Sequence, residues 1–193
     1  MSGRYLPLPG VDRDPLVVDA ALDLHAALIP LLSVVLTRRP GEFTTLCEIG
    51  CGSGRLLRDC TERLPQIVRY IGLHDSRTQT QLNRTLYRDF PIRFECLSLL
   101  DWLATQATPG TVFLTDADEL RSFDAALLGA IWRAWRQSLR PALLAIAIPV
   151  PAGTASGSEL PLLADIRRHA RAVRYAIEMN FASRQVCLVV AEF

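Results

Sequence analysis

The fold of this chain is decided by one short stretch, TLCEIGCGSG at residues 45–54. Its first half is a mostly apolar run typical of a buried strand, and its second half has three glycines at every second position. Glycine lacks a Cβ and tolerates positive φ, so a strand that ends in glycines and leads into a helix lets the backbone approach a ligand closely. The stretch therefore predicts a cofactor-binding turn of the nucleotide type.

The glycine spacing separates this turn from two other glycine-rich motifs. A dinucleotide fingerprint requires G-x-G-x-x-G, whereas Glu48 to Gly54 reads E-x-G-x-G-x-G. A P-loop requires a lysine, and every basic residue of this chain is an arginine. The absence of lysine also excludes Schiff-base and pyridoxal-phosphate chemistry.

Outside the turn, strand and helix patterns alternate along the chain. Strands are expected near residues 44–49, 68–73, 93–97, 111–115 and 142–149, and helices or helical turns near 14–38, 55–64, 77–89, 100–105 and 124–139. A loop and a helical pattern at 159–170 follow, and the apolar runs 173–179 and 186–193 predict a closing hairpin at one sheet edge. The order predicts a three-layer α/β fold, Rossmann-like, with a seven-stranded, mostly parallel sheet whose last strand is reversed.

Composition excludes several classes of protein. With 193 residues, 50% hydrophobic and 21% charged, the chain is long and apolar enough for one folded domain with a real core. A net charge of +1 provides no field that attracts nucleic acid or anionic lipid, and the longest apolar stretch is too short to span a bilayer. Five cysteines without a C-x-x-C pair indicate neither a disulfide framework nor a zinc site. We therefore expect a cytoplasmic protein that binds no nucleic acid, membrane or metal.

The E-x-G-x-G-x-G strand end, the strand–helix alternation, the Leu139-Arg140-Pro141 lead-in to the fifth strand and the closing hairpin resemble the class I S-adenosylmethionine-dependent methyltransferases. The resemblance covers about residues 44–193 and implies S-adenosylmethionine as the cofactor. It divides the chain into a cofactor-binding domain at 44–193 and an amino-terminal arm with a helical lid at 1–43. The lid helix is also the candidate contact of a homodimer.

The resemblance implies that the cofactor is bound at the ends of the first three strands. The implied residues are Glu48, Gly50, Cys51, Gly52, Gly54, His74, Asp75, Ser98 and Leu99. Two positions depart from the family: His74 replaces the acid that binds the ribose hydroxyls, with Asp75 one residue later, and Ser98 replaces the aspartate that reaches the adenine amino group. A hydrogen bond to a charged group is worth roughly 1.5 to 3 kcal/mol, so both departures weaken the expected contacts.

The candidate catalytic residues follow the fourth strand, because the carboxyl ends of parallel strands line the ligand site. By resemblance Asp116 lies nearest the cofactor, and Asp118 or Glu119 is the candidate base that takes a proton from an oxygen acceptor. The alternative is purely structural: Asp118 and Glu119 start a turn and cap the following helix.

The absence of several family motifs restricts the possible classes of methyl acceptor. The fourth strand is not followed by Asn/Asp-Pro-Pro-aromatic, no Pro-Cys pair is present, and no Asp-Asn follows the fifth strand. These absences argue against base-amino, glutamine, cytosine-C5 and metal-dependent methylation as the family performs them. We expect methyl transfer to an oxygen or nitrogen of a small molecule. The alternatives are an inactive binding or partner subunit, a different reaction that uses the same cofactor and, last, a nicotinamide oxidoreductase.

Overall fold

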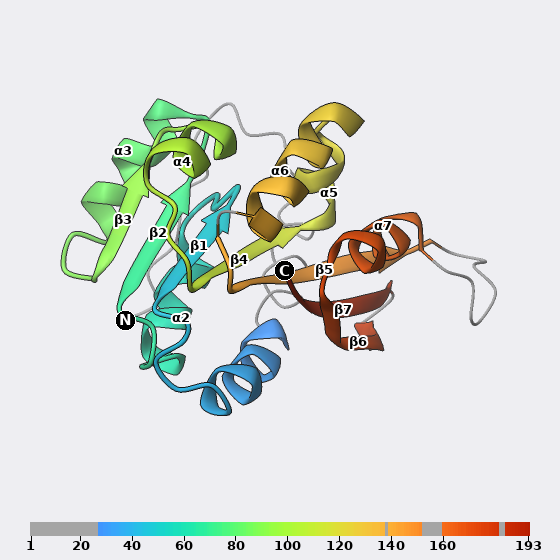
Figure 1. Cartoon of the computed structure of the whole chain (residues 1–193). Helices are drawn as coiled ribbons and strands as arrows, with labels where there is room; N and C mark the ends of the chain where they lie inside the picture. The colour runs from blue at the N-terminus through green and yellow to red at the C-terminus, as the bar shows by residue number, and fades with distance from the viewer. Residues whose placement is uncertain (1–26, 138, 152–159, 182–183) are drawn as a thin grey trace.

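The computed structural model describes residues 27–137, 139–151, 160–181 and 184–193, which contain a seven-stranded sheet with helices on both faces (Figure 1). The strands are β1 (Thr45–Ile49), β2 (Arg69–Leu73), β3 (Ile92–Glu95), β4 (Thr111–Asp116), β5 (Ala142–Val150), β6 (Ala172–Phe181) and β7 (Arg184–Glu192). The helices are α2 (Arg55–Arg63), α3 (Arg77–Leu86), α4 (Leu99–Thr105), α5 (Ala117–Arg121), α6 (Ala125–Gln137) and α7 (Pro161–His169). Residues 27–37 form a further helix.

The strand order is β3-β2-β1-β4-β5-β7-β6. The pairs from β3 to β5 are parallel, and β7 lies antiparallel between β5 and β6. This confirms the predicted Rossmann-like sheet with a reversed last strand. The predicted closing hairpin is also confirmed, with β6 at the sheet edge.

Most predicted element ends agree with the structure to within three residues. One helix was missed: α5 has five residues, too few for a periodic apolar pattern, and it begins directly after β4. The helix predicted at 14–38 is confirmed over 27–37, and its earlier part lies outside the described residues.

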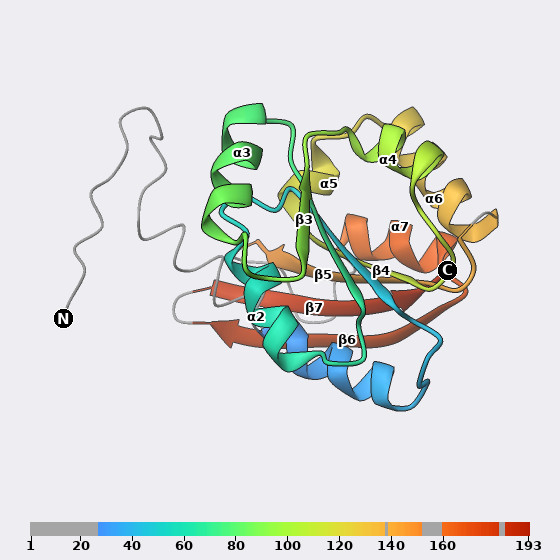
Figure 2. The same ribbon diagram turned by 90° about the vertical axis from the view of Figure 1, so that its left-hand side faces the viewer.

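Helices cover both faces of the sheet (Figure 2). The side chains of the strands alternate between two apolar layers, one on each face. In β1, Cys47 and Ile49 pack in the layer under α4, α6 and α7, whereas Leu46 packs in the layer that contains α2 and the 27–37 helix. Stacked aromatic rings such as Phe113 and Trp135, with centroids 4.5 Å apart, fill the first layer. The two layers hold β1 in the middle of the sheet. Within the described part of the chain, no helix has the length and hydrophobicity of a membrane span.

A buried ion-pair network lies at the end of the sheet where β5 begins. The Glu192 side chain is 2% exposed and pairs with Arg39, at 3.0 Å, and with Arg174, whose Nε donates to Oε2 at 3.0 Å. Burial opposes ionisation of Glu192, but the hydrogen bonds and charges of these arginines outweigh it and lower its pKa. The network connects Arg39, two residues after the 27–37 helix, to the β6–β7 hairpin.

Glu192→Gln is expected to lower the free energy of unfolding at pH 7 by about 1 to 3 kcal/mol, because three arginines, Arg39, Arg171 and Arg174, lose their buried counter-charge. The folded protein holds fewer protons on Glu192 than the unfolded chain, whose pKa is near 4.5. The stability that ionised Glu192 contributes is therefore fully present above about pH 4.5, and it is lost as the pH falls through the lower pKa of the folded protein. Denaturant titrations at neutral and acidic pH measure both effects.

The matched control is Glu178→Gln, an exposed glutamate on the same hairpin. It is expected to change the unfolding free energy by less than about 0.5 kcal/mol. Equal losses in the two variants, or a Glu192→Gln loss that does not depend on pH, would contradict this account.

Candidate cofactor site

The turn after β1 is built from three glycines in the left-handed region. Gly50, Gly52 and Gly54 have φ values of 70°, 47° and 74°, which residues with a side chain rarely adopt. A Cβ on Gly54 would lie 2.7 Å from the Phe94 ring, whereas the nearest atom to a Cβ on Gly52 would be the Gly50 carbonyl oxygen at 3.9 Å. Gly54 is therefore required by packing, and Gly52 presents its backbone to open space.

Hydrogen bonds fix the turn to β2 and α3. The Cys51 N–H donates to the Leu73 carbonyl at 3.0 Å, and the Asn83 side chain donates to the Gly52 carbonyl at 2.8 Å. Asn83 is fully buried, and its Oδ1 accepts a hydrogen bond from Gln79 one helical turn earlier. The turn is thus held by the protein itself. Asn83 was not predicted as a site residue, and the only signal in the sequence was a pair of amide side chains four residues apart.

The turn lies where the chain switches direction across the sheet. From β1 the chain proceeds to β2 and β3 on one side, and then returns to β4 on the other side of β1. Ligands of open α/β sheets bind at such a switch point, outside the carboxyl ends of the strands. The position of this turn is therefore that of a cofactor site.

Glu48 brings a buried carboxyl group to this point. Burial and the nearby charge of Asp116 raise the pKa of Glu48 to about 8, although a hydrogen bond with the Leu57 backbone opposes the shift. Its Oε2 atom is buried and has no hydrogen-bond partner among the described residues. A cationic ligand group would supply the missing partner.

The acids after β4 separate into two positions. Asp116 caps α5, its Oδ1 accepting the Glu119 N–H at 2.7 Å, and Glu119 extends back to the glycine turn. A Cβ on Gly50 would lie 2.7 Å from the Glu119 Oε2. Asp118, in contrast, is 85% exposed and lies 3.4 Å from Arg121. The structure brings Asp116 and Glu119 to the turn and leaves Asp118 at the surface. Asp118 and Glu119 both lie in the first turn of α5, but the residue that caps this helix is Asp116.

Solved methyltransferase structures share this architecture. The N-methyltransferase NodS from Bradyrhizobium japonicum WM9 is 14% identical, with 90% of this chain and 96% of that chain covered and a TM-score of 0.65. Magnesium protoporphyrin IX methyltransferase (ChlM) from Synechocystis PCC 6803, with bound SAM, is 10% identical over 95% of this chain and 86% of that chain, with a TM-score of 0.61. The putative methyltransferase yhhF from Escherichia coli is 18% identical over 98% and 92%, with a TM-score of 0.53.

The chain has the class I methyltransferase fold. At these identities the likeness establishes the fold alone. No protein-family model and no curated protein sequence matches the chain.

In the methyltransferase fold, the carboxyl end of β2 is the expected ribose position. Here the His74 Nδ1 accepts the Ser76 N–H at 2.9 Å, and the Asp75 Oδ1 lies 2.9 Å from the same nitrogen. The Asp75 side chain is 96% exposed. The imidazole is therefore turned toward its own loop, whereas the Asp75 carboxylate is open to a ligand.

The remaining predicted residues have structural partners. The Ser98 hydroxyl caps α4 by accepting the Asp101 N–H at 3.1 Å, and Leu99 packs in the core under that helix. The Cys51 thiol is buried beside Asn83, and burial, with the charge of Glu48, raises its pKa well above the ordinary value. Cys51 therefore offers its backbone rather than a reactive thiol. Within the described ranges, no three His, Cys, Asp or Glu side chains form a group that could hold a metal ion.

Glu48→Gln is expected to raise the free energy of unfolding near pH 9 by about 1 to 3 kcal/mol, since it removes a buried charge that lacks a full set of partners. The folded protein holds the Glu48 proton up to about pH 8, while the unfolded chain releases it near pH 4.5. Between these values the folded state binds more protons, so the stability contributed by this group falls as the pH rises. The neutral glutamine lacks this dependence.

Denaturant titrations from pH 5 to pH 9, roughly the window between the two pKa values, measure the difference. Glu62→Gln is the control, because Glu62 lies on the exposed side of α2 and pairs with Arg58. If Glu48→Gln and the wild type lose stability equally with rising pH, the Glu48 carboxyl group does not titrate as described.

Proposed function

We propose that this chain uses S-adenosylmethionine to transfer a methyl group to an oxygen or nitrogen of a small molecule. The observation that carries the proposal is the fixed glycine turn at the switch point, with the unpartnered buried oxygen of Glu48 at the end of the same strand. A backbone cradle beside an unsatisfied buried acid suits a ligand with a carboxylate, an ammonium and a sulfonium group.

The charges around the turn suit this cofactor. Glu48, Asp116 and Glu119 come together from β1, β4 and α5, so the carboxyl ends of the central strands carry acids that a cation would neutralise. We propose that a bound ammonium group displaces the proton that Glu48 holds at neutral pH. Because Glu119 lies against Gly50, its side chain would turn toward the ammonium group or away from the cradle when the ligand binds.

At the adenosine end, we assign the ribose contact to Asp75 rather than His74. The Asp75 carboxylate is exposed, and the His74 ring already accepts a backbone hydrogen bond. The Ser98 hydroxyl caps α4 and the Leu99 side chain is buried. We therefore propose that these two residues contact the adenine with their backbone atoms.

The protein's own contribution to the reaction is positioning and proton transfer. S-adenosylmethionine supplies a methyl group that its sulfonium already activates, so the chain needs to hold the acceptor in line and accept its proton. Asp116 is the proposed base because one of its oxygens is used by the helix cap, and no hydrogen bond of the other is found among the described residues. Asp118 is exposed, and its proposed role is to contact the acceptor at the rim.

A small acceptor is favoured by the near-neutral charge of the chain. Structures of similar fold include magnesium protoporphyrin IX methyltransferase and an N-methyltransferase, so the fold by itself does not select the acceptor. We retain residues 1–43 as a proposed arm and lid. The five cysteines are free thiols, which agrees with the proposed cytoplasmic location.

A non-catalytic, cofactor-binding or partner-regulating role is the second candidate. It is favoured by His74 at the ribose position and by the Glu119 carboxylate against Gly50, both of which oppose tight cofactor binding. The two candidates differ in affinity and in product, and one set of experiments separates them.

Calorimetry with S-adenosylmethionine and S-adenosylhomocysteine is expected to give saturable binding, and Gly52→Ala is expected to weaken it at least about tenfold because the new methyl group projects into the open side of the cradle. Gly41→Ala is the matched control: Gly41 also has a positive φ, 77°, and a Cβ added there would have no atom within 4 Å. Each substitution costs about 1 to 2 kcal/mol of stability.

Only Gly52→Ala is expected to affect binding. Absent or millimolar binding by the wild type would favour the non-catalytic role. Equal effects of the two substitutions would show that the glycine turn is not part of the binding site.

Mass spectrometry of small-molecule pools incubated with S-adenosylmethionine tests the reaction. A gain of one methyl group supports transfer, and a product without that gain indicates another reaction.

A further inference from the structure

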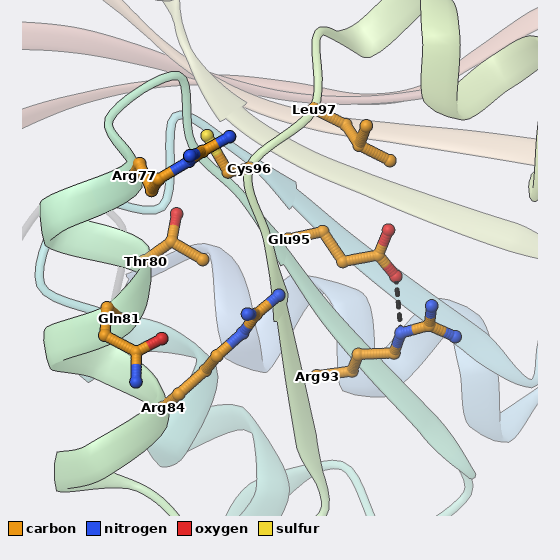
Figure 3. A pocket seen from close by; sticks show the side chains of 8 residues that line it. All are labelled: Arg77, Thr80, Gln81, Arg84, Arg93, Glu95, Cys96 and Leu97. Carbon is orange, nitrogen blue, oxygen red and sulfur yellow. Dashed lines mark ion pairs between the residues drawn. The ribbon is translucent and has the colours of Figure 1, made fainter.

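A second feature of the molecule lies apart from the glycine turn, at the open edge of the sheet. A hollow of about 370 Å³ lies between α3 and β3, the edge strand of the sheet (Figure 3). Arg77, Thr80 and Arg84 extend toward it from α3, while Arg93 and Glu95 extend from the other side of β3 (Figure 3). The hollow therefore passes over the edge strand and is lined from both sides.

The charges that line this hollow do not balance. Three arginines line it with one carboxylate, Glu95. That carboxylate is already used, because its Oε1 lies 2.6 Å from the Arg93 Nε and its Oε2 accepts a hydrogen bond from Gln106 at 2.7 Å. Two positive charges, those of Arg77 and Arg84, are left without a counter-charge from the lining residues.

Arg84 is held in place by the edge strand. Its Nε donates to the Phe94 carbonyl at 2.8 Å, and within the described ranges no partner is found for the terminal nitrogens of the guanidinium group, which a ligand could use. A guanidinium group presents its donors as a planar fork that matches two phosphate oxygens. For Arg77, which is exposed, no hydrogen bond or ion pair is found in the described part of the chain.

The position of Arg84 also decides against an added strand as the occupant. An open sheet edge invites pairing with an extended peptide, and a charged side chain across the edge blocks it. Arg84 already donates a hydrogen bond to the outward-facing Phe94 carbonyl, which an added peptide strand would need as an acceptor. The volume lies within the range of small-molecule sites and exceeds that of a simple ion.

We propose that the α3–β3 hollow binds the phosphomonoester group of a small molecule through Arg77 and Arg84. Two uncompensated positive charges match a phosphate dianion better than a single carboxylate. The Cys96 thiol, at one end of the hollow, donates to the Asp75 carbonyl at 3.3 Å, so the site adjoins the turn between β2 and α3. The proposal does not depend on the proposed methyl transfer.

Titration calorimetry with inorganic phosphate and with glycerol 3-phosphate, at constant ionic strength, tests the site. We expect one saturable site in the wild type, and Arg77→Gln should weaken binding at least about tenfold through loss of a charge-assisted contact. Arg77 is the informative position because its side chain is exposed, so the variant is expected to fold. Arg84→Gln should have a similar effect and is judged only if its unfolding transition matches that of the wild type.

Arg88→Gln is the control, because Arg88 is exposed, pairs with Asp89 and does not line the hollow. Tighter binding of glycerol 3-phosphate identifies an organic phosphate as the ligand, whereas equal affinities identify the phosphate group alone; both support the site. The proposal is overturned if the wild type shows no saturable phosphate binding, if Arg88→Gln weakens it as much as Arg77→Gln, or if an acidic peptide binds where phosphate does not. S-adenosylhomocysteine affinity, measured on the same variants, tests the proposed function separately.

Discussion

One aromatic ring interlocks the glycine turn with the two strands beside it. A Cβ on Gly54 and a Cβ on Gly72 would each lie 2.7 Å from Phe94, so the ring fits only because both positions lack a side chain. Phe94 belongs to β3, Gly72 to β2 and Gly54 to the start of α2. This contact fixes where α2 begins relative to the sheet, and therefore the direction in which the turn faces. The turn so placed contains the left-handed glycines and accepts the Asn83 hydrogen bond, and the α2 backbone at Leu57 forms a hydrogen bond with Glu48.

The ionic groups are divided between the two ends of the strands. At the carboxyl ends, burial and the charge of Asp116 raise the pKa of Glu48, so an ionised Glu48 is unfavourable for stability without a ligand. At the opposite end, Glu192 is ionised among arginines and stabilises the fold. This division is expected for a protein in which the carboxyl ends of the strands bind a ligand and the opposite ends stabilise the fold. The arginine-lined hollow at β3 is a third, separate charged region.

The sequence predicted the fold well because its signals are local. Apolar runs of strand length marked the strands, and two final runs separated by a short polar turn predicted the hairpin that reverses the last strand. A local pattern also explains Ser98, since Ser98 with Asp101 three residues later is a helix-capping signature. The five-residue α5 was not predicted because it is shorter than two helical turns.

The candidate site was predictable only in part, because it depends on side chains that cross between elements. Glu48 and the three glycines lie within one continuous stretch, so their proximity follows from the chain. Asn83 and Glu119 reach the turn from α3 and α5, and their directions depend on how those helices pack. No local pattern distinguishes Asp75, which is open to a ligand, from the neighbouring His74, which faces its own loop.

The proposed function depends on binding of a sulfonium-type cofactor at the turn of residues 50–54. Amide chemical shifts recorded by NMR during titration with S-adenosylhomocysteine test it most directly, because they report the location of binding as well as its strength. We expect the largest saturable shifts at Gly50, Gly52 and Gly54, with smaller ones at Asp75 and Asp116, and little change around Glu192. Unchanged shifts at the turn, or shifts confined to another part of the sheet, would contradict it.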